Sequence, residues 1–297
     1  MNTLLKRLQR PAGLVNAVLD TDTYNEIDDQ FALAYFLKSP EKIIPQAVYA
    51  APFSNSRAKT PAEGMEKSYQ EIQNILNLCG RTDVPSYRGS TQYLPNEETP
   101  VDSPAARDLI SRAMASEGPL YVLVIGAITN IAAAILLEPK IIDKIVVIFL
   151  GGHAQHWPPL PEFNMRQDVA AGRVVFGCGV PLVHLPVMGV VSHLSTTEPE
   201  LRHHLKGKSP LCDYLYDFTC KTAVHDGGNA AWSRIIWDIS AVAWLLGEGF
   251  VQDTIITAPI PSYDQGYIQD PRRHMIRSAY HVNRDAIFLD LFQKISK

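Results

Sequence analysis

Residues 15–30 of this chain read VNAVLDTDTYNEIDDQ, so a short apolar run leads into five acidic residues within ten positions. The apolar run is typical of a buried strand, and Ala32, Leu33 and Phe36 then recur at helical spacing. The acidic residues therefore fall at a turn from a strand to a helix. In an open α/β sheet, such a turn lies at the carboxyl edge of the strands, where ligands usually bind.

The acidic residues themselves indicate a cation site. Asp28 and Asp29 alone have a simpler explanation, because acids at the N-terminus of a helix stabilise it by about 0.3–1 kcal/mol each. That explanation covers two of the five acids. Carboxylates within a few ångströms of one another repel and take up protons unless a cation compensates their charge. A ligand set made only of oxygen atoms favours Ca²⁺ or Mg²⁺ over zinc.

The rest of the chain repeats the alternation of apolar runs and helical patterns. This rhythm predicts an α/β fold with an open, mostly parallel sheet flanked by helices, in one continuous domain over residues 1–297. A proline-rich run at 158–161 is too short to separate domains. Further strands are expected at 43–51, 120–126, 144–150, 181–187, 254–258 and 275–282, and helices at 62–78, 105–116, 130–137, 168–176, 211–223 and 235–246.

Composition limits the partners of the protein. The chain has 27 basic and 31 acidic residues, and the resulting charge of −4 gives no electrostatic reason to expect nucleic acid or an anionic membrane. The expected partner is a small molecule. The four cysteines form no Cys-x-x-Cys pair, and the first ten residues lack the apolar core of a signal peptide. We therefore expect a short surface helix at the start and a reducing, cytoplasmic location.

Several segments together resemble the nucleoside hydrolases, the inosine-uridine-preferring ribohydrolase family. Asp20-x-Asp22 followed by Asp28-Asp29 is similar to the family's amino-terminal signature, although the intervening loop is two residues longer here and lacks Pro-Gly. The similarity runs in the same order from about residue 15 to residue 243. It continues in the segment VLVIGAITNIA at 122–132, in Leu137-Glu138-Pro139, in Gly151-Gly152 followed by Glu162-Phe163-Asn164 and Asp168, and in Trp237-Asp238.

This resemblance implies a Rossmann-like architecture and a ribonucleoside substrate, with Ca²⁺ (or Mg²⁺) holding the attacking water and the ribose diol. It also implies a homodimer or homotetramer. Asp22 would be the general base and Asp20 would support the loop by hydrogen bonds. By position in the motifs, the metal ligands would be Asp22, Asp29, Asp238 and the main-chain carbonyl of Ile125, and the residues that hold the ribose hydroxyls would be Asp28, Asn55, Glu162 and Asn164.

Individually, these residues also have structural readings. Asn55 follows Pro52-Phe53-Ser54 and is typical of a turn residue. Glu162 can belong to a loop in which Phe163 is held in the core. Asp238 can cap a helix. Their ordered agreement with the acidic segment favours the functional reading.

Recognition of the base is the least determined part of the site. Trp237 replaces a family histidine before the late aspartate, so Trp237 and Trp157 are candidates for stacking on the base. His156 and His153 are candidates for donating a proton to the leaving group, which predicts a preference for purines. The longer loop at 23–27 is expected to be exposed, although Asn25 or Glu26 can contact the substrate or the metal.

Two alternatives remain open at this point. The run Asp20-Thr21-Asp22-Thr23 resembles the first motif of haloacid-dehalogenase-type phosphohydrolases, in which Asp20 would be the nucleophile, Asp22 the acid/base and Mg²⁺ the cofactor. The second alternative is a metal-dependent nucleoside or sugar sensor that keeps the fold without turnover.

Overall fold

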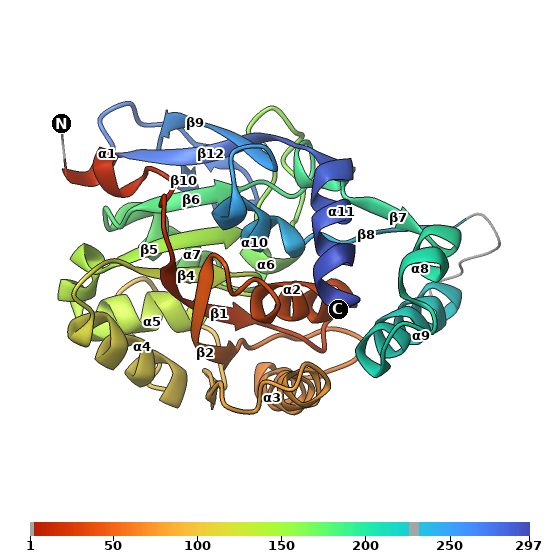
Figure 1. Cartoon of the computed structure of the whole chain (residues 1–297). Coiled ribbons are helices and arrows are strands. Elements are labelled where there is room, and N and C mark those ends of the chain that lie inside the picture. Colours follow the sequence, from red (N-terminus) through yellow and green to blue (C-terminus); the bar gives the residue numbers. More distant parts are fainter. Residues whose placement is uncertain (1–2, 226–231) are drawn as a thin grey trace.

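An eight-stranded sheet forms the centre of the computed structural model, which describes residues 3–225 and 232–297 (Figure 1). The strand order is β3-β2-β1-β4-β5-β6-β12-β9, and every adjacent pair is parallel except β12 with β9. The predicted open, mostly parallel sheet is therefore confirmed. Its strands are β1 (Val15–Thr21), β2 (Ile43–Ala50), β3 (Ser86–Arg88), β4 (Leu120–Val124), β5 (Ile145–Leu150), β6 (Leu182–Leu185), β9 (Val251–Thr257) and β12 (Met275–Val282).

Helices cover both faces of this sheet, as expected for a sheet whose central strands β4 and β5 are apolar and fully buried. One face packs against α2 (Asp28–Leu37), α3 (Pro61–Leu78), α10 (Ile239–Leu246) and α11 (Arg284–Ile295). The other face packs against α4 (Pro104–Ala115), α5 (Thr129–Leu137) and α7 (Val169–Gly177). The remaining helices are α1 (Thr3–Arg7), α6 (Phe163–Gln167), α8 (Glu198–Leu205), α9 (Pro210–His225) and the 3₁₀ helices η1 (Pro139–Asp143) and η2 (Val191–His193).

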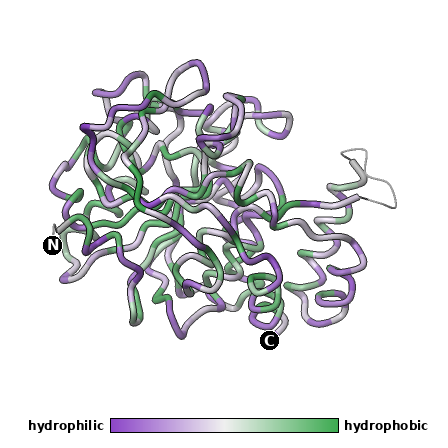
Figure 2. Tube along the Cα trace, turned by 90° about the horizontal axis from the view of Figure 1, so that it is seen from above, coloured by the Kyte–Doolittle hydropathy of each residue, from purple (hydrophilic) through white to green (hydrophobic). Residues whose placement is uncertain are grey.

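Successive side chains of the strands enter two different cores. Leu19 and Leu123 point to the face of α2 and α10, whereas their neighbours Val18 and Val122 point to the face of α5. Figure 2 shows the result, with apolar residues along the strands and polar ones mainly on the outside. Burial of each large apolar side chain stabilises the fold by roughly 1.5–3 kcal/mol.

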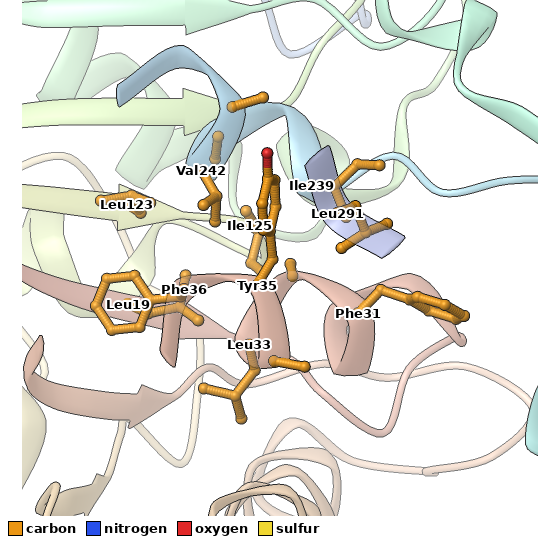
Figure 3. Close-up of a cluster of buried hydrophobic side chains, with 14 of the residues drawn as sticks. Leu19, Phe31, Leu33, Tyr35, Phe36, Leu123, Ile125, Ile239, Val242 and Leu291 are labelled. Carbon is orange, nitrogen blue, oxygen red and sulfur yellow. The ribbon is translucent and has the colours of Figure 1, made fainter. Parts of the chain in front are cut away.

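Helix α2 is central to the first core. All ten of its residues are buried, because it lies between the sheet and helices α3, α10 and α11. In Figure 3, Tyr35 extends from α2 toward Ile239 and Val242 of α10. The Tyr35 hydroxyl donates a hydrogen bond to the Asp290 carboxylate on α11. This packing holds the first turn of α2, with its two aspartates, firmly against the end of β1.

The connections between strands create a topological switch point between β1 and β4, where the strand order reverses. Strand β1 pairs with β2 on one side and with β4 on the other, so the chain turns in opposite directions after these strands. Such a point opens a crevice at the carboxyl ends of the strands. Residues that follow β1, β4 and β5 therefore meet there.

Some expected elements differ in the structure. The helix expected from residue 235 begins at Ile239, because β8 (Ser233–Ile235) pairs instead with β7 (Ser195–Thr197) in a separate two-stranded sheet. A second short hairpin joins β10 (Ile260–Pro261) to β11 (Tyr267–Ile268). The expected surface helix at the start is α1, but Leu8 immediately after it is fully buried.

Within residues 3–225 and 232–297, no helix has the length and apolar character needed to cross a membrane. All four cysteines are free thiols.

Candidate active site

The turn after β1 buries its carboxylates instead of exposing them. Asp22, Asp28 and Asp29 are all at most 3% exposed. The loop folds back on itself because the Asn25 amide donates to the Asp22 carbonyl at 2.7 Å. The Thr21 hydroxyl donates to Asp29 Oδ1 at 2.5 Å, which ties the end of β1 to the first turn of α2. The turn thus brings the carboxylates of Asp22, Asp28 and Asp29 close together.

A fourth carboxylate joins them from a distant part of the chain. Asp238 precedes α10, and carboxylate oxygens of Asp28, Asp29 and Asp238 lie within 4.8 Å of one another. The Trp237 amide donates to Asp28 Oδ2 at 3.1 Å, which fixes this approach. This group of three includes Asp28, which the sequence assigned to the sugar, and leaves out Asp22, although Asp22 lies within hydrogen-bond reach of Asp29.

These residues line a cavity of about 250 Å³. Both carboxylate oxygens of Asp22 are buried there, and no N–H or O–H donor of the described residues bonds to them, because the side chain within hydrogen-bond reach is the Asp29 carboxylate. The lining holds six acidic side chains, while none of its described members is lysine or arginine. The predicted metal ligands Asp22, Asp29, Asp238 and Ile125 and the predicted sugar ligands Asp28, Glu162 and Asn164 all line this one cavity.

The electrostatics of the cavity require a positive charge or bound protons. Burial raises the pKa of Asp22, Asp28 and Asp238 well above the ordinary value, and their neighbouring carboxylates raise it further. Burial also raises the pKa of Asp29, to about 7. Unpaired carboxylate oxygens, crowded acids and an adjacent main-chain carbonyl form a donor set that fits a hard divalent cation.

Asp20 lies behind the cavity. It is fully buried and accepts a hydrogen bond from Asn130 Nδ2 at 2.8 Å, while Asn130 Oδ1 accepts from the Ser90 amide at 2.7 Å. Burial raises the pKa of Asp20 to about 8. Asp20 thus links the end of β1 to the start of α5 and does not line the cavity.

Glu162 and Asn164 are held by a short helix that sequence reasoning took as a loop. The Glu162 carboxylate caps α6 and accepts amide hydrogen bonds from Gly152, Asn164 and Met165 at 2.6, 3.0 and 2.8 Å. The Asn164 side-chain amide donates to the carbonyls of Ile125 and Leu150, at 3.1 Å each. Asn164 therefore joins the ends of β4 and β5 at the cavity wall.

Three predicted substrate or catalytic residues lie outside the cavity. Asn55 is a turn residue, since its Oδ1 accepts from the amides of Arg57 and Ala58 at 2.7 and 3.3 Å. His156 is exposed and packs near Gly189. Trp157 lines a different, neighbouring cavity.

Other candidates from the same segments do line the acidic cavity. Asn25 accepts a hydrogen bond from Asn55 Nδ2 at 2.7 Å, is 8% exposed and lines the acidic cavity with Glu26. The expected exposure of the 23–27 loop is therefore wrong for Asn25. His153 lines the cavity where His156 does not, and the predicted Trp237 lines it as well. The Asn-Glu insertion between Asp22 and Asp28 was the sequence signal for Asn25.

Comparison with known proteins identifies similar chains. The family model described as "inosine-uridine preferring nucleoside hydrolase" matches residues 17–288. A putative pyrimidine-specific ribonucleoside hydrolase, RihB, of Shigella dysenteriae is 29% identical over 220 residues, which cover 64% of this chain and 80% of that protein. The RihB of Escherichia coli K12 is 29% identical over 216 residues, covering 63% and 68%.

Solved structures show the same fold. A plant nucleoside hydrolase, PpNRh1, superposes with a TM-score of 0.77 at 18% identity, covering 96% of this chain and 99% of that one. A purine-preferring ribonucleoside hydrolase from Gardnerella vaginalis gives a TM-score of 0.75 at 22% identity, covering 95% and 98%. The match to the family model over residues 17–288 excludes the phosphohydrolase alternative, and Asp20, its expected nucleophile, is fully buried and is not among the residues that line the cavity.

Proposed function

Because the chain belongs to the inosine-uridine preferring nucleoside hydrolase family and is thus an N-glycosyl hydrolase, we propose that Asp22 is the general base of its reaction. The reaction splits a ribonucleoside into ribose and base, with water as the nucleophile. The observation that carries the assignment is the Asp22 carboxylate, which belongs to the cavity lining and whose two buried oxygens receive no hydrogen bond from a donor group of the described residues. Burial and the neighbouring carboxylates raise the pKa of Asp22, so its carboxylate, once ionised, is a stronger proton acceptor than an exposed aspartate.

A divalent cation completes this proposal, with Ca²⁺ preferred and Mg²⁺ as the second choice. The residues that would hold it are Asp22, Asp29, Asp238 and the carbonyl of Ile125, and Asp28 lies beside them. When bound, the cation lowers the pKa of water and binds the vicinal diol of a ribose. The acidic residues then remain ionised at neutral pH, which keeps Asp22 able to accept a proton.

The sugar is held by the other polar groups of the cavity. Asp28 faces the diol, while Glu162 and Asn164, which also line the cavity, bind the remaining hydroxyl. Asn55 acts through Asn25, which its amide positions. Cleavage of the glycosidic bond passes through an oxocarbenium-like transition state, and fixed carboxylates near the sugar stabilise its positive charge.

Trp237 and His153 are the residues proposed to bind the base as it leaves. Trp237 is half-buried in the lining, and its ring offers a face on which a protonated purine stacks. His153 Nδ1 accepts from the Met188 amide at 3.3 Å, so a neutral His153 ring carries its proton on Nε2. Burial lowers the pKa of His153, which favours hydrogen bonding to the base over full proton transfer. We therefore propose that the enzyme prefers purine ribosides. We also propose that it is a cytoplasmic homo-oligomer.

A panel experiment tests the proposal. Purified protein is incubated with Ca²⁺ or with EDTA and a set of purine and pyrimidine ribonucleosides, and released ribose is measured. We expect release with Ca²⁺, loss of release with EDTA, and the fastest release from purines. Binding of nucleosides without any ribose release would favour the sensor alternative.

A further inference from the structure

A second cavity adjoins the acidic one. It encloses about 680 Å³ between the loop at 152–162 and the hairpin of β10 and β11. His153 and Glu162 line both cavities, so they form a shared wall. The cleavage reaction proposed above uses only the smaller cavity. The larger one is therefore available to a part of the ligand that extends past Glu162.

The lining of the second cavity favours an uncharged, hydrogen-bonding group. Its polar side chains include Gln155, Gln265 and Gln269, and its acids are Asp264 and Glu162. None of the described residues that line it is lysine or arginine. A phosphate here would face two carboxylates without a compensating cation, which disfavours it. Amide and carboxylate groups instead suit hydroxyls.

Aromatic side chains add to this chemistry. Trp157 provides an apolar face in the lining, of the kind on which a flat or ring-shaped group packs. The Tyr267 hydroxyl is buried and has no hydrogen-bond partner among the described residues. It lies so close to Gly152 that a Cβ there would be 2.0 Å away, and Gly152 adopts a φ of +71°. The Tyr267 hydroxyl thus packs against the Gly152 main chain, while Tyr267 itself belongs to the cavity lining beside Trp157.

We propose that this second cavity is a subsite for an uncharged, hydroxylated substituent on the sugar of the substrate, such as a second sugar joined to the ribose 5′-oxygen. The inference rests on the proposed function. There the cation and the acidic residues take the 2′ and 3′ hydroxyls, so the 5′-oxygen is the one that lies beside Glu162. A substituent on that oxygen enters the second cavity through the shared wall.

Gly266 offers a way to fill the subsite without touching the catalytic residues. It lines the second cavity only, and a Cβ at this position would meet Pro159 at 3.6 Å, an ordinary contact. Gly266→Leu extends a side chain into the space, whereas Gly266→Ala adds one methyl group and serves as the matched control. Both keep the main-chain bond from the Ser262 amide to the Gly266 carbonyl.

The test measures binding by calorimetry to the Ca²⁺-loaded protein, using three ribosides that cannot be hydrolysed. They are 1-C-phenyl β-D-ribofuranoside, its 5-O-β-D-glucopyranosyl derivative and its 5-phosphate. We expect the glucosyl derivative to bind at least about fivefold more tightly than the parent, the gain from about one hydrogen bond. The phosphate should bind more weakly than the parent. Gly266→Leu should remove the advantage of the glucosyl group, and Gly266→Ala should keep it.

The results separate the two proposals. Equal or weaker binding of the glucosyl derivative, or an advantage that survives Gly266→Leu, overturns the subsite while the parent riboside still binds. Tighter binding of the phosphate than of the glucosyl derivative also overturns it. Failure of all three ribosides to bind contradicts the proposed nucleoside site itself, and the subsite with it.

Discussion

The side-chain amide of Asn164 donates a hydrogen bond to the main-chain carbonyl of Ile125 at 3.1 Å. This contact connects a proposed sugar ligand to a proposed metal ligand across the ends of two neighbouring strands. A second bond to the Leu150 carbonyl fixes the same amide from the other side. A hydrogen bond thus connects the proposed sugar site with the proposed cation site, and a substitution in one site should alter binding in the other.

Removal of this link is the first test. We expect Asn164→Ala to lower kcat/KM for a good ribonucleoside by at least about tenfold, the effect of losing a positioning hydrogen bond to the sugar. Affinity for Ca²⁺, measured by calorimetry, should change by only a few fold. Wild-type kcat/KM in this variant would exclude Asn164 from sugar binding.

Stability in the absence of a cation should depend on pH in an unusual direction. The pKa of Asp29 is raised to about 7, and the pKa values of Asp22, Asp28 and Asp238 are raised as well. Between about pH 4 and pH 7 the folded state therefore binds protons that the unfolded state has released. Stability in EDTA should fall as pH rises through this range.

Ca²⁺ should reverse that loss. The rise in Tm on adding Ca²⁺, measured by differential scanning fluorimetry, should be larger at pH 8 than at pH 5.5, because the ion replaces protons at the carboxylates. The same melting measurements in NaCl of matched ionic strength control for general screening of charge. A Ca²⁺ effect that is the same at both pH values would mean that the acidic cluster is not the binding site.

His184 should act in the opposite direction on the acid side. It is fully buried on β6, its Nε2 donates to the Gly151 carbonyl at 2.8 Å, and burial lowers its pKa to about 4. Below about pH 6.5, His184 is therefore protonated in the unfolded state but still neutral in the folded state. The free energy of unfolding consequently falls as the pH drops from 6.5 toward 4. His184→Gln keeps a donor near Gly151 and removes the titration.

Urea unfolding of Ca²⁺-loaded protein at pH 6.5 and pH 5 measures this effect. The loss of stability between the two pH values should be smaller in His184→Gln than in the wild type. A loss of equal size in both proteins would assign the acid sensitivity to other groups.

Trp237 should matter for the base and little for the sugar. We expect Trp237→Ala to lower turnover of purine ribosides far more than turnover of 4-nitrophenyl riboside, whose leaving group needs no protonation. Trp237→Phe keeps an aromatic face and should retain most of the purine activity. Equal losses on both substrates in Trp237→Ala would indicate collapse of the cavity.

The parts predicted from the sequence were those encoded by local patterns. The apolar run before Asp20 and the helical spacing after Asp29 were enough to predict strand, turn and helix. Apolar runs that include Leu123 and Ile148 likewise predicted central strands of a mostly parallel sheet. These segments are buried on both faces, so their composition alone carries the signal.

The parts that were missed depend on contacts between distant segments. The burial of Asn25 follows from a hydrogen bond to Asn55, thirty residues away. Glu162 caps a five-residue helix and accepts a hydrogen bond from the Gly152 amide. The periodicity of the sequence reveals neither contact. The choice of His153 over His156 depends on how one loop packs on the residues around Gly189. Hydrogen-bond geometry of this kind is decided by the tertiary structure.

Asp22 is the proposed general base of a cation-dependent ribohydrolase. The most direct test compares ribose release by the wild type and by Asp22→Asn at Ca²⁺ concentrations that calorimetry shows to be saturating for each protein. Asparagine keeps the shape of the side chain but cannot accept the proton. We predict that Asp22→Asn still binds Ca²⁺ and that its turnover falls by at least about 10²-fold, the low end for loss of a general base. Wild-type turnover in Ca²⁺-saturated Asp22→Asn would contradict the account.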